Sequence, residues 1–100
     1  MAIQASEVER AASRALGELL RTRRLAKALS QERLANEIGI NRNYYQQMES
    51  GISQRNPRTP ANPTFLMLMR LSEVLDVPVG QLVDEAIEAG KQEIRRRNGE

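Results

Sequence analysis

Four side chains near the middle of the chain carry paired hydrogen-bond donors and acceptors at spacings that suit the tip of a short helix. They are Arg42, Asn43, Gln46 and Gln47. Arg can donate two hydrogen bonds to the O6 and N7 atoms of guanine, and Asn or Gln can bridge N6 and N7 of adenine. Any one of these residues is equally typical of an exposed helix face. Four together, directly after a glycine turn, indicate contact with base edges.

The residues around this set predict two short helices joined by a tight turn. Ser30 can cap the first of them, and Gly39 suits its left-handed end. Asn41 can then cap a second helix that runs from Arg42 to about Ser50 and stops at Gly51. Such a helix-turn-helix places its second helix in the DNA major groove. The side chains expected to be buried are Leu34, Ala35, Ile38, Tyr45 and Met48.

Three further helices are expected, and they make the chain an all-α, compact five-helix domain with an extended first helix. Ser6 and Glu9 form a capping box, so the first helix should run from about residue 7 to residue 27. After a loop at residues 52–62, Asn62 is the expected cap of a fourth helix, with Pro63 in its first turn. Asp76-Val77-Pro78 should end that helix, and a fifth should begin near residue 79. The expected core faces of these two helices are Phe65, Leu68, Leu71 and Leu75, followed by Leu82, Val83 and Ile87.

Contacts to DNA phosphates are expected on both sides of the major groove. Gln31 lies in the first turn of its helix, where free N–H groups and the helix dipole favour an anion. The ring of Tyr44 could cover a thymine methyl group, its hydroxyl could reach a phosphate, or the side chain could pack at the rim of the core. The other expected phosphate contacts are Ser30, Ser50, Arg55 and Arg58.

Arg24 and Glu49 both occupy helix faces that are otherwise apolar. An ion pair between them would join the first helix to the third. Its role would be structural, because it would position the helix that reads the bases.

Composition excludes several functions. The 100 residues include no cysteine and no histidine, which rules out disulfides, zinc fingers and histidine general bases. No motif groups a nucleophile with a base, so we expect no enzyme, no metal and no cofactor. Residues 19–60 hold eight basic and three acidic residues, a local net charge of +5 that suits a phosphate surface. The first residues lack an unbroken apolar run, so we expect a cytoplasmic protein without a membrane span.

In their order along the chain, these residues resemble the lambda-repressor-like (Cro/repressor, XRE) helix-turn-helix DNA-binding family. The resemblance covers roughly residues 14–85. It is carried by Leu16-Gly17-Glu18, Leu20-Arg21, Arg24, Leu29-Ser30-Gln31-Glu32, Leu34-Ala35, Ile38-Gly39-Ile40-Asn41, Tyr44, Glu49, Gly51, Asn62-Pro63-Thr64, Leu68, Leu71 and Leu75-Asp76-Val77-Pro78.

The resemblance implies a five-helix bundle that binds double-stranded DNA as a homodimer on a palindromic operator. By position it implies base contacts from Arg42, Asn43 and Gln47, phosphate contacts from Gln31 and its neighbours, and a structural Arg24–Glu49 pair. The sequence departs from the family at Ala28, where the family usually has Gly, and in a longer loop between Gly51 and Pro63.

Outside the family core we expect an N-terminal helical extension at residues 1–13 and a C-terminal helical, basic tail at residues 86–100. The basic run at residues 95–97 is either a solvated end or an auxiliary DNA contact. Apolar residues outside the expected core suggest a dimer interface, although the N-terminal extension could instead cover them within one chain. These residues are Leu66, Met67, Val74, Val83 and Ile87.

The function expected from the sequence is that of a transcriptional regulator, specifically a repressor. Two alternatives stay open. One is a DNA-binding antitoxin, which would associate with a toxin; an antirepressor is a further possible protein partner. The other is a protein-interaction module that keeps the fold without binding DNA.

Overall fold

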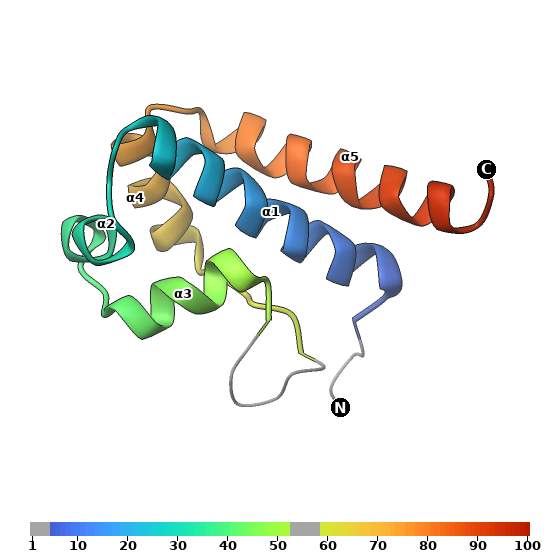
Figure 1. Cartoon of the computed structure of the whole chain (residues 1–100), viewed down its shortest axis with the longest axis horizontal. Coiled ribbons are helices and arrows are strands. Elements are labelled where there is room, and N and C mark those ends of the chain that lie inside the picture. The colour runs from blue at the N-terminus through green and yellow to red at the C-terminus, as the bar shows by residue number, and fades with distance from the viewer. Residues whose placement is uncertain (1–4, 53–58) are drawn as a thin grey trace.

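A computed structural model describes residues 5–52 and 59–100, and within them the chain forms five helices (Figure 1). The predicted all-α fold is therefore confirmed. An isolated antiparallel bridge joins Ile52 to Pro60 where the chain leaves and re-enters the described region. The helices are α1 (Glu7–Ala26), α2 (Gln31–Ile38), α3 (Arg42–Ser50), α4 (Phe65–Leu75) and α5 (Val79–Arg97).

Side-chain caps fix where the first four helices begin. Ser6 and Glu9 form the predicted capping box at α1, while Ser30 and Asn41 accept hydrogen bonds from backbone N–H groups in the first turns of α2 and α3. The predicted cap of α4 was wrong, because the cap is Thr64 rather than Asn62. The Thr64 hydroxyl accepts from the N–H of Met67 at 3.2 Å, so the helix begins two residues later than expected.

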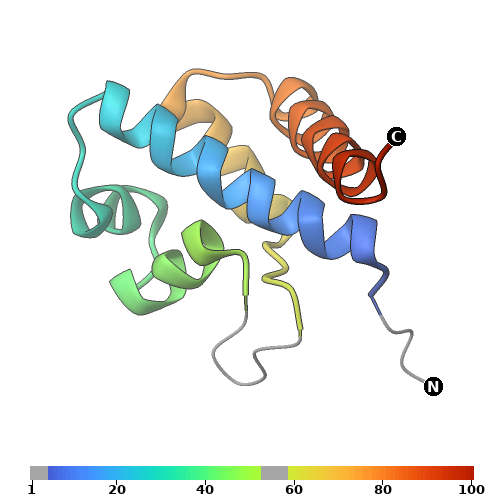
Figure 2. The same cartoon turned by 45° about the vertical axis from the view of Figure 1, so that its right-hand side comes forward.

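The α1 and α5 helices run antiparallel beside each other and lie across the three shorter helices (Figures 1 and 2). The core fills the space between α1 and the short helices, and Val77 closes it between α4 and α5. Its fully or almost fully buried members include Leu20, Leu34, Ala35, Ile38, Tyr45, Met48, Leu71, Leu75, Val77 and Leu82.

The core face of α4 differs from the expected one. Phe65 was predicted to be buried, yet 70% of its surface is exposed, whereas Met67 and Val74 pack against the core. Leu71 follows Phe65 by six residues, which places the two side chains about 120° apart around the helix axis. Phe65 therefore turns outward when Leu71 and Leu75 face the core.

Both long helices continue without a break beyond the region that resembles the family. A glycine inside a helix usually weakens it, yet α5 continues through Gly90 to Arg97. Gly90 is buried where α5 meets α1, and a Cβ atom placed on it would lie 2.6 Å from the backbone nitrogen of Ala12. The glycine therefore permits the two backbones to approach closely.

Replacing Gly90 with Ala should destabilise the fold by about 1–3 kcal/mol, because the added methyl group would push α1 and α5 apart. Gly80→Ala is a matched control in the same helix, where nothing lies within 4 Å of the added Cβ atom. That change should be neutral or stabilise the fold by up to about 1 kcal/mol. Urea unfolding followed by circular dichroism measures both, and equal effects would contradict the close approach.

The turn between α1 and α2 contains a residue in the left-handed conformation that glycine adopts most easily, although this residue is Ala28. Ala28 has a φ of +56°, in the left-handed region that costs an L-residue about 1–2 kcal/mol.

Ala28→Gly should therefore stabilise the protein by about 0.5–1 kcal/mol, once the greater freedom of glycine in the unfolded chain is deducted. Ala89→Gly makes the same change at an exposed position inside α5 and should destabilise by about 1 kcal/mol. Opposite shifts in melting temperature are the expected result. A loss of stability from Ala28→Gly would show that the turn carries no strain.

Candidate nucleic-acid interface

The first turn of α3 projects from the molecule with its polar side chains outward. Arg42, Asn43 and Gln46 are exposed, while Gln47 is half-buried. Their positions follow from the burial of Tyr45 and Met48, which fixes the opposite side of the helix in the core. The structure thus brings three of the four predicted base-reading side chains onto one outward face. Gln47 lies at the edge of that face.

The turn that precedes α3 is held from both ends. Gly39 adopts the predicted left-handed conformation, and the N–H of Ile40 donates to the carbonyl oxygen of Ala35 at 3.0 Å. The Asn41 side chain accepts from the N–H of Tyr44 at 2.8 Å. Both hydrogen bonds satisfy backbone or cap groups at a helix end, so the direction of α3 relative to α2 is set locally.

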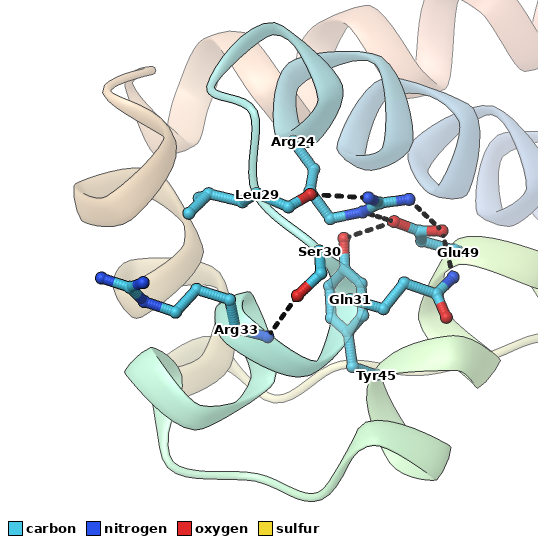
Figure 3. Close-up of polar contacts among 7 residues, drawn as sticks. All are labelled: Arg24, Leu29, Ser30, Gln31, Arg33, Tyr45 and Glu49. Carbon is cyan, nitrogen blue, oxygen red and sulfur yellow. Dashed lines mark hydrogen bonds and ion pairs between the residues drawn. The ribbon is translucent and has the colours of Figure 1, made fainter.

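A buried carboxylate joins α3 to the rest of the molecule. Glu49 accepts from Arg24 on α1, with 2.5 Å between Nε and Oε1 and 3.3 Å between Nη2 and Oε2 (Figure 3). It also accepts from Gln31 on α2 at 2.7 Å and from the Tyr45 hydroxyl at 2.8 Å. Only 9% of the Arg24 side chain and 6% of the Glu49 side chain are exposed.

The same arginine also fixes the entrance to α2. Arg24 Nη1 donates to the carbonyl oxygen of Leu29 at 2.8 Å, one residue before the Ser30 cap (Figure 3). The planar guanidinium group therefore binds two separate acceptors in a fixed geometry. As a result α1, the turn after it, α2 and α3 all meet at one polar cluster.

Comparisons with known proteins agree with this geometry. The family model described as "Helix-turn-helix domain" matches residues 15–86, more than half of the chain. The chain belongs to this helix-turn-helix family. The resemblance seen in the sequence is thus confirmed, and membership indicates DNA-binding transcription regulation as the general activity.

A solved structure has the same fold as this helix-turn-helix protein. It is the clp gene regulator ClgR from Corynebacterium glutamicum, with a TM-score of 0.69 and 20% sequence identity. The alignment covers 87% of the present chain and 84% of the ClgR chain. A search by sequence among curated proteins gave no significant match.

Within the helix-turn-helix, the residues predicted to touch phosphates have contacts of their own. The exposed Ser30 hydroxyl accepts from the N–H of Arg33 at 3.0 Å. One N–H group of the Gln31 amide is taken by Glu49, and Ser50 donates to the carbonyl oxygen of Gln47 at 2.8 Å. The contact of Ser30 is the predicted cap of α2, whereas the contacts of Gln31 and Ser50 were not predicted from the sequence. Arg55 and Arg58 lie outside the described residues.

Tyr44 occupies a position between the core and the surface. It packs against the core and, with Gln47 and Met48, lines a shallow pocket of about 210 Å³. Residues 59–62 form the other wall of this pocket. The ring of Tyr44 therefore packs at the rim of the core, as one of the three alternatives for this residue proposed. The residue is half-buried beside the outward face of α3.

Arg70 is a positioning residue that the sequence did not reveal. From α4, its Nη1 atom donates to the carbonyl oxygen of Ile38 at 2.9 Å. This carbonyl is the last of α2, where a cation is favoured by the helix dipole. An arginine inside an apolar helix stretch was the only available signal, and its partner is 32 residues away in the chain.

The described residues contain no group of three or more acidic, histidine or cysteine side chains that could hold a metal. Among these same residues, no helix is both long and apolar enough to cross a membrane.

The buried cluster shifts three pKa values, and the hydrogen bond to Glu49 raises that of the Arg24 guanidinium. Burial by itself raises the pKa of the Glu49 carboxyl, but hydrogen bonds from Arg24, Gln31 and Tyr45 outweigh this effect and lower the pKa overall. Burial raises the pKa of the Tyr45 hydroxyl, and its hydrogen bond to Glu49 adds to the shift. The cluster therefore holds a charged carboxylate and a neutral phenol at neutral pH.

Glu49→Gln should cost about 3–5 kcal/mol at neutral pH, because the Arg24 charge would lose its buried partner. A lowered carboxyl pKa stabilises the fold above the unfolded-state pKa, and this contribution is lost as the pH falls through the folded-state value. The difference between wild type and variant should therefore shrink below about pH 4. Glu18→Gln, at an exposed carboxyl on α1, is the control. Chemical unfolding between pH 7 and pH 3 measures the free energy of unfolding of each protein. A difference between wild type and Glu49→Gln that does not change with pH would contradict the lowered pKa of Glu49.

Proposed function

We propose that this protein binds double-stranded DNA in a sequence-specific manner and acts as a transcriptional repressor in the cytoplasm. In this proposal a homodimer binds a palindromic operator, and α3 of each copy enters the major groove. The observation that supports it most is the outward tip of α3, where Arg42, Asn43 and Gln46 are exposed beside a buried cluster that holds the helix in place.

The dimensions favour the major groove. The groove is about 12 Å wide, and a helix with its side chains is about 10–12 Å across. The exposed side of α3 carries no acidic side chain, because Glu49 turns inward to Arg24. A helix of this kind can approach the bases without placing a carboxylate against the phosphates.

The base-reading roles follow from the donor and acceptor patterns. Arg42 matches guanine, and Asn43 and Gln46 match adenine, with about 1–3 kcal/mol of discrimination for each bidentate pair. Gln47, at the edge of the face, is assigned a contact at the border of the half-site. These contacts would select sequence, whereas phosphate contacts would fix position.

The phosphate contacts are assigned to the start of α2 and the flank of α3. The Ser30 hydroxyl keeps its proton for a donor role while its oxygen accepts from Arg33. Gln31 would add its backbone N–H and its second amide N–H. Tyr44 would contribute its hydroxyl, and Ser50 is assigned to the far side. Arg55 and Arg58 are proposed to add charge from the loop.

Selection of bound oligonucleotides from a random pool should yield a two-fold symmetric motif. Gln46→Ala should then relax the preference at one or two base pairs, with a loss of about 1–3 kcal/mol on the selected site only. Gln92→Ala removes an exposed amide from α5 and should leave affinity and preference unchanged.

Affinity should also fall steeply with salt, since phosphate contacts release counterions. Equal affinity for all DNA sequences would contradict the assignment of base contacts to α3. If the protein binds no DNA, or binds DNA with an affinity that does not depend on salt, the protein-interaction module would be favoured. Copurification of a second protein from the native source would favour the antitoxin.

A further inference from the structure

The first two turns of α4 carry a cluster of apolar side chains that the fold leaves uncovered. The exposed fractions are 70% for Phe65, 51% for Leu66 and 48% for Met69. These three residues, called here the α4 patch, fall within an arc of about 100° on the side of the helix opposite to Leu71 and Leu75. Other large exposed apolar residues of the described chain lie singly on other elements.

We propose that the α4 patch is the surface through which two copies of this chain associate. Together its side chains expose on the order of 300 Å² of apolar surface, a size at which patches on soluble proteins are often functional. A stable dimer needs about 800 Å² from each partner, with an apolar centre and a polar rim. The patch supplies such a centre.

The charges beside the patch favour a second copy over a charged partner. The patch itself is neutral, and the exposed side of α4 adds one cation, Arg70, and one anion, Glu73. In a two-fold symmetric contact each copy offers both signs to the other, so the surface is complementary to itself. A strongly acidic or basic partner would find no matching charge here.

This assignment changes the set of interface residues expected from the sequence. Leu66 stays in the interface, but Met67 and Val74 pack against the core of their own chain. Phe65 and Met69 take their place because they are exposed. Val83 is half-buried on α5, and Ile87 lies exposed on that helix apart from the α4 patch.

The α4 helix is attached firmly to the helix-turn-helix. Arg70 holds the last carbonyl of α2, while Leu71 and Leu75 are buried in the same core as Tyr45 of α3. Pairing through α4 would therefore fix the separation and direction of the two α3 helices. That consequence, which sets the half-site spacing, rests on the proposed DNA-binding function.

Charge substitutions at Met69 test the contact without DNA. Sedimentation velocity should show a dimer for the wild type at high micromolar concentration. Met69→Glu and Met69→Lys should each raise the dimer dissociation constant at least tenfold, because like charges would meet near the symmetry axis. An equimolar mixture of the two variants should restore the dimer as a heterodimer.

Ile87→Glu and Leu25→Glu are matched controls, since each places the same charge on an exposed apolar residue elsewhere. Both should remain dimeric. The proposal is overturned if the wild type is a monomer, if Met69→Glu dimerises like the wild type, if Ile87→Glu dissociates the dimer instead, or if the mixture stays monomeric.

DNA measurements separate this inference from the proposed function. Met69→Glu should bind a single half-site with wild-type affinity and salt dependence, but lose at least tenfold on the full palindrome. A wild-type dimer that binds no DNA would refute the function and leave the α4 contact standing. A monomer that still reads half-sites would refute the α4 contact alone.

Discussion

The carboxylate of Glu49 is the interaction on which the position of the candidate recognition helix depends. It lies near the C-terminal end of α3 and accepts hydrogen bonds from side chains of α1, α2 and α3 itself. A charge in this location is costly unless every lone pair has a partner, so the three elements must meet in one arrangement. The exposed tip of α3, one to two turns away, is positioned by that requirement together with the turn at Gly39 and the Asn41 cap.

A division of roles along α3 follows from this arrangement. Tyr45, Met48 and Glu49 face inward and fix the helix, whereas Arg42, Asn43 and Gln46 face outward and remain available. The inward residues tolerate little change, because each belongs either to the close-packed core or to the polar cluster. The outward residues could vary between related chains without altering the fold, and under the proposed function such changes would alter the DNA sequence that is bound.

The α1 and α5 helices show how far packing extends beyond the helix-turn-helix unit. They remain in contact along most of their lengths, and Gly90 lets their backbones approach at Ala12. Ion pairs such as Arg14–Glu93, at 2.7 Å, lie on the exposed side of this contact. Pairs of this kind are solvated and add little stability, so close packing of small residues is the main contribution.

The sequence by itself determined the five helices, the caps of α1, α2 and α3, and the turn before α3, because capping side chains, left-handed glycines and apolar periodicity act over three or four neighbouring residues. It also pointed to Arg24 and Glu49, since charges on apolar helix faces must find partners. Only the tertiary structure decided what depends on distant contacts. These features include the exposure of Phe65, the burial of Met67 and Val74, the Gly90–Ala12 approach and the hydrogen bond from Arg70 to Ile38. Each is set by the angle at which two helices meet, and no local pattern of residues encodes that angle.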